Sequence, residues 1–386
     1  MNVLWYYAIG FVIIWVLALL FKDKLKIDVN GPLLMRRTLR MRDLIDSIAQ
    51  KSPRFWKLFM NIGIPVSVFF MGLMIYFIIL SLKTFTTAPP ASPILPGVDY
   101  PGNPIYLPLG YGLIGLATVI VVHEFAHGIL ARVEGIKIKS IGVLLLGVLP
   151  GAFVEPDEEG VKKASRLAKL RIYAAGSIFN LSLAFIALLI VFLVSNFAIA
   201  PSFHSDGIEI TSVVPNSPAE GILKEGMIIY SINGKSTNNI TEYANTLNKT
   251  KIGDELTFQT NQGVFKVKTG SNPNNSTRSY IGIRSTEHQV INEDIAVKYG
   301  NTLPWILFYL KDLFNWIFLL NFVVGTFNLL PMKPLDGGHI FEEILSYKLS
   351  KETVKPIVNG VSFVLIAFLV VSLIYGVGRG ILLSLS

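Results

Sequence analysis

Two histidines and a glutamate are grouped in the short stretch "VVHEFAHGIL", which runs from Val121 to Leu130. On a helix, His123 and His127 are four residues apart and share one face, so both imidazoles can reach the same metal ion. Glu124 lies beside them, close enough to take a proton from a bound water. This spacing is typical of a zinc (Zn2+) site that hydrolyses its substrate.

A third protein ligand is needed, because a catalytic zinc has three such ligands and one position left for water. Asp336, in "NLLPMKPLDGGH" (Asn328 to His339), is the strongest candidate. Pro331 and Pro334 break the helix just before it, and it follows an apolar segment that ends at the depth expected for the histidines. The alternative is that Asp336 only caps the helix that follows.

The composition indicates the surroundings of these residues. The chain has 386 residues, of which 52% are hydrophobic and only 16% are charged, as in a polytopic membrane protein. The net charge of +8 comes largely from basic residues beside apolar segments, where membrane topology explains them, so nucleic acid is not an expected partner. The absence of cysteine excludes thiol catalysis and disulfides.

Several apolar segments are long enough to cross a bilayer, which takes about 20 residues. Burying two histidines and a glutamate within one of them is costly unless they are paired or bind metal, which argues against an idle set. The segments are Leu4 to Phe21, about Ile62 to Leu82, about Leu109 to Arg132 with the histidines, about Ile172 to Ala200, one between Leu303 and Leu330, and one between Ile357 and Leu383.

Lysine and arginine predict the orientation of these spans. Ten of them lie between Lys22 and Lys57 and eight between Arg132 and Arg171, so both segments should be cytoplasmic. The segment Thr84 to Pro108 has none and should face outward. We therefore expect an integral protein of the cell membrane, surrounded by lipid, with its active site near the cytoplasmic side.

A polar segment of different character separates the fourth and fifth spans, from about Phe203 to Lys298. Its pattern "SPAEG...LKEGMIIYSINGK" resembles the PDZ family, and the helix predicted at Asn239 to Thr250 corresponds to the one that lines the PDZ groove. PDZ domains bind a peptide by adding a strand to a sheet edge. The expected division is residues 1–203, a PDZ-like extracytoplasmic domain at 204–298 that binds a peptide or substrate segment, and residues 299–386.

The segment Gly135 to Glu159 follows the histidine helix and is too short to span the bilayer. Its β-forming residues, interrupted by glycines, predict a re-entrant β-hairpin, which membrane depth tolerates only where it is buried in protein or lines a cavity. We expect Val143, Leu144 and Leu145 to offer an open strand edge to an unwound substrate. The alternative is a hydrophobic loop that only packs under the helices.

Taken together, "HEFAH", "GSIFN" (Gly176 to Asn180) and "NLLPMKPLDGG" resemble the site-2 proteases, the intramembrane zinc metalloproteases. The three motifs occur in the family's order, with the PDZ-like segment between the last two. The resemblance implies that His123, His127 and Asp336 bind zinc and that Glu124 is the catalytic base. It also implies that Asn328 contacts substrate or the oxyanion, and that Asn180 serves packing or substrate handling.

The expected fold is a mostly α polytopic membrane protein of about six transmembrane helices, with a re-entrant β-hairpin and a small α+β PDZ-like domain. The expected function is hydrolysis of peptide bonds within transmembrane segments of protein substrates. Two other classes remain open: a catalytically idle membrane scaffold that binds peptides through the PDZ-like domain, and a metal-handling transporter. Neither of them needs Glu124 as a base.

Overall fold

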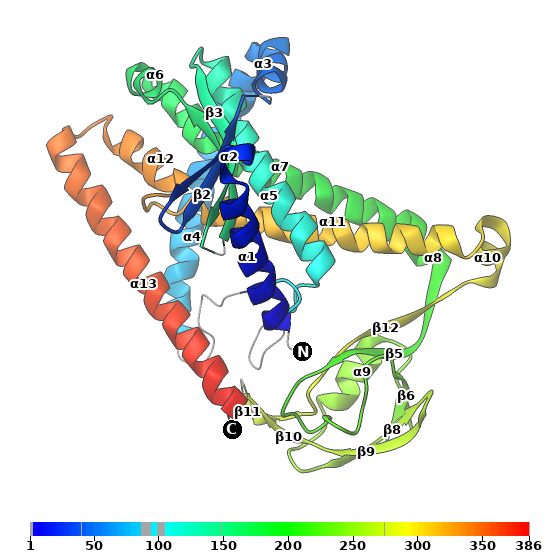
Figure 1. The fold of residues 1–386 in the computed structure, drawn as a ribbon. Coiled ribbons are helices and arrows are strands. Elements are labelled where there is room, and N and C mark those ends of the chain that lie inside the picture. The colour runs from blue at the N-terminus through cyan, green and yellow to red at the C-terminus, as the bar shows by residue number, and fades with distance from the viewer. Residues whose placement is uncertain are drawn as a thin grey trace. The chain divides into compact units, whose positions relative to one another are not determined.

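The computed structural model describes residues 3–39, 41–85, 94–98, 105–147, 149–273 and 275–385 (Figure 1). Most of the segment Thr84 to Pro108, predicted to face outward, lies outside these ranges. Within them, five helical segments are long and apolar enough to cross a membrane. They are Pro53–Thr84, Leu109–Val133, Arg166–Ser202, Thr302–Phe327 and Lys351–Gly376. These correspond to the second to sixth predicted spans.

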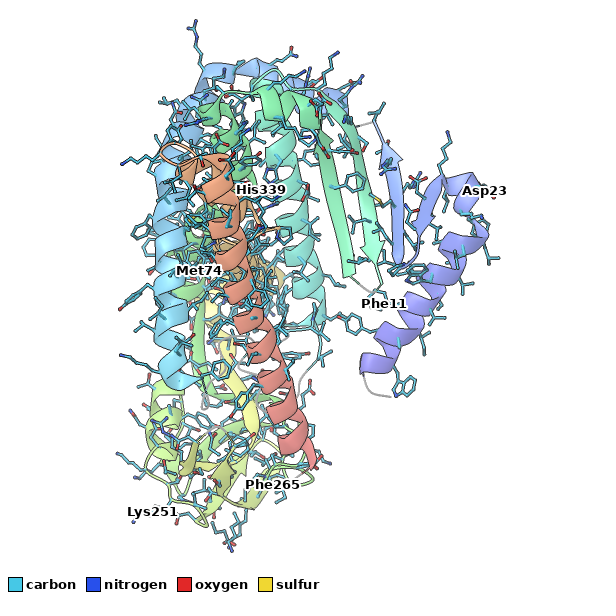
Figure 2. All side chains as sticks on the ribbon, turned by 90° about the vertical axis from the view of Figure 1, so that its left-hand side faces the viewer. Phe11, Asp23, Met74, Lys251, Phe265 and His339 are labelled. Carbon is cyan, nitrogen blue, oxygen red and sulfur yellow. The ribbon has the colours of Figure 1, made fainter. Side chains whose placement is uncertain are left out.

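The first predicted span also forms a helix, α1 (Val3–Leu20), whose described apolar part, Tyr7–Leu20, is shorter than the other five. Its large apolar side chains point outward along much of its length, and Val12 is 62% exposed (Figure 2). The indole Nε1 of Trp15 donates to the carbonyl of Gly147 at 2.7 Å, which attaches the helix to this part of the chain. A span count of five is therefore supported by length and composition, and a sixth stays a prediction.

The helices that follow α1 are α2 (Lys22–Leu25), α3 (Arg42–Lys51), α4 (Pro53–Ser81), α5 (Leu109–Val133), α6 (Glu158–Lys163) and α7 (Arg166–Val194). A 3-10 turn at Leu82–Thr84 continues α4, and a π-helical turn at Ser195–Ile199 joins α7 to α8 (Ala200–Ser202). Later in the chain come α10 (Glu293–Tyr299), α11 (Thr302–Phe327), α12 (Asp336–Leu345) and α13 (Lys351–Leu385).

A four-stranded antiparallel sheet accompanies these helices, in the order β1 (Ile27–Asn30), β2 (Leu33–Thr38), β3 (Ile138–Leu146) and β4 (Leu149–Pro156). The predicted hairpin is present as β3 and β4. The sequence analysis did not predict β1 and β2, which come from the segment after α1; β1 pairs with β2, and β2 pairs with β3, more than 100 residues further along the chain.

The predicted strand edge at Val143, Leu144 and Leu145 is wrong. These residues pair with β2 on one side and with β4 on the other, so their backbone groups have no free edge to offer. The open edge that adjoins α5 belongs to β4 instead. The prediction failed because alternation of side chains defines the faces of a strand but does not define its neighbours.

Buried side chains around α5 form the core of this region. Ala126, Leu130 and Ala131 of α5 are fully buried and pack in one cluster with residues of α3, α4, α7 and the sheet, among them Ile45, Met60, Ala174, Ile141 and Val154. Glycine at position 128 lets these elements come close, because a Cβ there would lie 3.0 Å from Val154 and 3.1 Å from Ile45. The helix with the histidines is thus fixed by packing on several sides.

The segment between α8 and α10 is an α+β domain. Its six-stranded antiparallel sheet has the order β12-β5-β6-β8-β9, with β7 paired to β6, and a separate hairpin, β10–β11, adjoins it. The strands are β5 (Phe203–Val213), β6 (Ile228–Ile232), β7 (Lys235–Ser236), β8 (Glu255–Thr260), β9 (Gly263–Lys268), β10 (Gly270–Asn272), β11 (Asn275–Tyr280) and β12 (Ile283–Ile291), with the helix α9 (Ile240–Leu247).

Asn239 caps α9, because its side chain accepts a hydrogen bond from the backbone N–H of Glu242 at 2.9 Å. The helix therefore begins where the PDZ-like pattern predicted it. By compactness the chain divides into two units, Met1–Leu82 with Pro108–Leu188 and Asn315–Val370, and Lys83–Leu107 with Leu189–Phe314 and Val371–Ser386. The second unit is wider than the predicted domain at 204–298, whose boundaries remain a prediction.

Candidate metal centre

The structure brings His123, His127 and Asp336 together. The Nε2 atoms of the two histidines are 3.2 Å apart, and the Asp336 carboxylate oxygens lie 3.4 Å from His123 Nε2 and 3.5 Å from His127 Nε2. One ligand atom from each residue lies within 4.8 Å of the other two, the only such group of three among the described residues. The side chains are 13–16% exposed, so the group is largely buried but still accessible to solvent.

Asp336 reaches the histidines because the chain turns sharply after α11. Gly337 donates its N–H to the carbonyl of Asn328 at 2.8 Å, which closes the turn. A Cβ at Gly338 would lie 2.5 Å from the backbone of Met332, and one at Gly337 would overlap the Leu329 carbonyl. The two glycines of "LDGG" are therefore required for the close approach that places Asp336 at the start of α12.

Backbone and side-chain groups of α7 orient the three residues. His127 Nδ1 lies 2.8 Å from the carbonyl of Ile172, which can only accept, so Nδ1 carries the proton and Nε2 faces the group with its lone pair. Ser177, fully buried, donates to the Asp336 carboxylate at 3.2 Å. Gly176 lets the rings approach α7, since a Cβ there would lie 2.5 Å from both His123 Cε1 and His127 Nε2.

Asn180 acts on the other histidine. Its side chain is completely buried, its Nδ2 lies 3.4 Å from His123 Nδ1, and its Oδ1 has no partner. When His123 Nε2 binds a cation, Nδ1 must carry the proton and donate. Exchanging the amide oxygen and nitrogen, which have nearly the same shape, lets the oxygen accept this hydrogen bond from His123 Nδ1. Asn180 is thus placed to hold His123, and its burial disagrees with the predicted contact to substrate.

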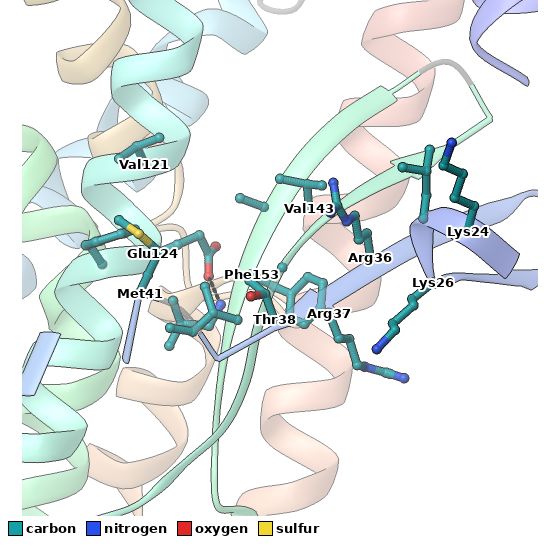
Figure 3. A pocket seen from close by; sticks show the side chains of 16 residues that line it. Lys24, Lys26, Arg36, Arg37, Thr38, Met41, Val121, Glu124, Val143 and Phe153 are labelled. Atoms are coloured by element: carbon teal, nitrogen blue, oxygen red, sulfur yellow. Dashed lines mark hydrogen bonds between the residues drawn. The ribbon is translucent and has the colours of Figure 1, made fainter. Parts of the chain in front are cut away.

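Glu124 forms a hydrogen bond with the sheet. Its Oε2 accepts a hydrogen bond from the backbone N–H of Val154 at 3.0 Å, on the side of β4 that does not pair with β3 (Figure 3). Glu124 and Val154 both line a cavity of about 860 Å³ between α5 and the sheet. The carboxylate of the "HEFAH" motif therefore stands at the junction of the metal group, a substrate-sized cavity and an open strand edge.

A second cavity, of about 400 Å³, borders the same group from the side of His127 and Asp336. It is also lined by Tyr173 and by His339 on α12, whose rings stack at a centroid distance of 5.0 Å. Burial lowers the pKa of His339, and the nearby Lys333 lowers it further, so this imidazole is neutral near pH 7. His339 is thus half-buried rather than a solvated surface residue.

Asn328 lies in the turn between α11 and Asp336 and is partly exposed. Its backbone carbonyl supports that turn, and no contact joins its side chain to the three ligands in the described residues. Sequence reasoning missed Ser177, although it stands within the "GSIFN" motif. It also missed the carbonyl of Ile172 and the N–H of Val154, because backbone groups leave no signal in the residue pattern.

The donor set fits zinc. Two neutral imidazole Nε2 atoms and a carboxylate are typical ligands of a catalytic zinc, which keeps a fourth position open. The hydrogen bond that His127 Nδ1 donates to the Ile172 carbonyl and the one that Ser177 donates to Asp336 fix both ligand types from behind. These features support the predicted zinc cofactor.

Comparison with known proteins agrees with this geometry. The chain is 26% identical over 337 residues to a candidate zinc metalloprotease of Clostridium perfringens, with 68% of this chain and 95% of that one covered. It is 27% identical over 136 residues to a membrane-bound transcription factor site-2 protease homolog of Arabidopsis thaliana, covering 35% and 26%. An uncharacterized protein of Methanocaldococcus jannaschii is 31% identical over 353 residues, covering 88% and 86%.

Among solved structures, the chain is similar to the PDZ domain of an SdrC-like protein from Listeria innocua, at 26% identity and a TM-score of 0.20, with 22% of this chain and 97% of that one covered. The model of a protein family described as Peptidase family M50 matches residues 111–369. This range contains His123, Glu124, His127 and Asp336. Since this range is well over half of the 386 residues, the chain belongs to Peptidase family M50.

Proposed function

We propose that this chain is a zinc-dependent intramembrane endopeptidase that hydrolyses peptide bonds in transmembrane segments of other proteins. The observation that carries the proposal is the His123, His127 and Asp336 group on apolar helices, with Glu124 directed into an adjoining cavity. In the proposed arrangement His123, His127 and Asp336 bind the zinc. Ser177, Asn180 and the Ile172 carbonyl hold these ligands in place.

Bound zinc supplies a Lewis acid that polarises the scissile carbonyl and lowers the pKa of water. Glu124 takes the proton from the attacking water and returns it to the leaving amine. The hydrogen bond from Val154 keeps the carboxylate in place while it does so. Asn328 is the proposed donor to the developing oxyanion, and its position in the turn before Asp336 supports this role.

The substrate must be extended before attack, because the peptide bonds of a helix are shielded by their own hydrogen bonds. We place the extended segment along the open edge of β4. Ala152 stands two residues from Val154, so its N–H points to the same free side of the strand. Pairing with this edge would align the substrate beside Glu124.

The PDZ-like domain is proposed to lie outside the cell and to restrict which substrates enter. Within this domain β12 is an outer strand of the sheet, and the backbone N–H of Ile240, at the start of α9, donates to Glu287 of β12 at 2.9 Å. A helix beside an outer strand is the arrangement to which a peptide can add a strand. Accessibility of this domain to an impermeant protease on intact cells tests its location.

The decisive experiment uses the purified full-length protein, its metal content and a membrane-spanning model substrate. Asp336→Ala should lose most of the zinc and the cleavage, whereas Glu124→Gln should keep the zinc and lose the cleavage. Glu159→Gln, at a side chain that is 66% exposed, is the control and should change neither. Full zinc occupancy in Asp336→Ala, or turnover near that of the wild type in Glu124→Gln, would refute the assignment.

The scaffold alternative makes the opposite prediction, since peptide binding by the PDZ-like domain would be unchanged in both variants and no cleavage would occur in the wild type. A transporter would need ligands along a path, whereas the group of described residues that could hold a metal lies at one place. The structure and the family therefore favour the enzyme.

A further inference from the structure

The cavity that Glu124 lines carries different charges at its two ends. Glu124, Phe125 and Val121 of α5 line one end, together with Val154 of β4. Four basic residues line the other: Lys24, Lys26, Arg36 and Arg37. Figure 3 shows Glu124 at one side of the cavity and Lys24 and Lys26 at the far side, across the sheet. The remaining lining residues are largely apolar, and Glu124 is the one acidic residue of the lining.

Much of this positive charge has no counter-charge within the protein. Arg37 pairs with Asp28 at 2.9 Å, but Lys24, Lys26 and Arg36 form no ion pair among the described residues, and all three are exposed. Lys26 has a positive φ of 53°, which ends α2 and turns the chain into β1. This turn brings Lys26 next to the Ile27–Arg36 pair of β1 and β2.

The register of the sheet relates these residues to the catalytic position. Thr38 pairs with Ile141, and Ile141 pairs with Val154, the residue that bonds Glu124. Arg36 pairs with Val143, and Val143 pairs with Ala152 of β4, which is two residues from Val154. Adjacent strands are about 4.8 Å apart, so Arg36 starts about 10 Å from β4, which is about three residues of an extended chain.

We propose that this end of the cavity, the basic shelf formed by Lys24, Lys26 and Arg36, selects substrates that carry acidic residues on the cytoplasmic flank of their transmembrane segment. This inference rests on the proposed function and specifies its substrate class. If Glu124 is the catalytic base, the chain being cut enters the cavity that Glu124 lines. Its next few residues leave the site over the shelf, where aspartate or glutamate finds three unpaired cations at about three to six residues from the scissile bond.

An anionic lipid headgroup is the competing occupant, because basic residues beside membrane spans also attract such lipids. The peptide is favoured here by the continuity of the cavity from the shelf to Glu124, since a headgroup bound on the shelf has no reason to share a cavity with the catalytic base. The two occupants differ in what they do to selectivity. A peptide contact changes the ratio of two substrates, whereas a lipid contact changes both substrates together.

The test compares two substrates with the same transmembrane segment, after mass spectrometry has located the bond that is cut. One has three glutamates on the cytoplasmic flank, three to six residues from this bond, and the other has three glutamines. With purified full-length enzyme in neutral detergent at low salt, kcat/KM should be on the order of tenfold higher for the acidic flank, as expected for a few exposed ion pairs together. This preference should shrink as salt is raised.

Lys24→Gln/Arg36→Gln should reduce the ratio to about twofold, because only one unpaired cation remains on the shelf. Lys24→Glu/Arg36→Glu should invert it in favour of a flank with three lysines. The matched control is Lys51→Gln/Arg54→Gln, which removes two exposed charges from the same predicted cytoplasmic segment but not from this cavity and should keep the wild-type ratio.

An unchanged ratio in both shelf variants would overturn the proposal. So would a result in which added phosphatidylglycerol raises turnover of both substrates equally and only the shelf variants lose that increase, since this would identify a lipid site. Failure of the proposed function is a separate outcome: wild-type enzyme with bound zinc would then cut neither substrate.

Discussion

The sheet β5–β12 and the sheet β1–β4 are both antiparallel, but their apolar side chains pack against different parts of the protein. Ile208, Ile229, Ile232, Leu256 and Phe258 are almost fully buried against one another in the first sheet. Ile138, Ile141 and Val154 of the second are buried in the cluster that surrounds α5. One sheet thus supplies its own core, and the other depends on the helix that carries the metal ligands.

Because of this difference, a substitution in one sheet should affect only the stability of that domain, whereas a substitution in the other should affect the candidate catalytic site. A change inside the β5–β12 core should stay within that domain, because few of its buried contacts leave it. A change in the β1–β4 sheet should be felt at Glu124, because Val154 belongs both to the shared core and to the hydrogen bond with Glu124. Four predictions test this contrast, from the largest expected effect to the smallest.

Glu124→Gln should lower kcat by about 10²–10⁴-fold, the usual contribution of general acid–base catalysis. The amide oxygen of glutamine can still accept from Val154, so both sheets and the zinc content should be unchanged. The measurements are turnover of the transmembrane substrate and metal analysis. Loss of zinc in this variant would mean that Glu124 is structural rather than catalytic.

Phe258→Ala should destabilise the β5–β12 sheet by about 3–5 kcal/mol, as for other fully buried aromatic residues. Hydrogen exchange of the full chain should show faster exchange in this sheet alone, with zinc content preserved. Ile141→Ala is the comparison variant, and it should also weaken zinc binding because Ile141 packs in the buried cluster around α5, the helix that carries His123 and His127. Equal zinc loss in both variants would contradict the contrast between the sheets.

Asn180→Ala should weaken zinc binding about 10–100-fold, the usual effect of removing a group that orients a metal-ligating histidine. Competition with a chelator measures this affinity without reference to activity. Asn180→Asp should restore much of it, because a carboxylate also accepts from His123 Nδ1. If alanine and aspartate weaken zinc binding equally, Asn180 serves packing only.

Ala152→Pro should lower kcat/KM about two- to tenfold, since it removes one backbone donor from the open edge of β4, worth about 0.5–1.5 kcal/mol. The ladder to β3 should survive, because this N–H points away from β3. Ala152→Ser keeps the donor and is the control. Equal activity of the two variants would show that the substrate does not pair with this edge.

Much of the candidate site could be predicted from local patterns. His123, Glu124 and His127 are fixed by helix periodicity alone, and an isolated aspartate after a helix broken by proline identified Asp336. The apolar spans could be predicted because bilayer thickness sets their length. Each of these inferences needs only residues that are near one another in the chain or a rule about the bilayer.

The rest depended on pairing over long distances. Nothing in the pattern of Leu33 to Thr38 indicates that this segment pairs with β3, and this pairing is what moves the open edge from Val143–Leu145 to β4. Likewise Ile172 and Val154 contribute backbone groups, which every residue possesses. Side-chain types therefore predicted the ligands, but they could not predict the groups that hold the ligands or the surface that receives the substrate.

The two cavities that border the metal group have a consequence for inhibition. The cavity at His127 and Asp336 shares Val154 with the larger one but contains neither Glu124 nor the basic shelf. At about 400 Å³ it is large enough for a small chelating molecule, which would reach the metal from the side of His127 and Asp336. Such an inhibitor would occupy the open metal position without contacting the basic shelf, so its affinity should be the same in the wild type and in the shelf variants.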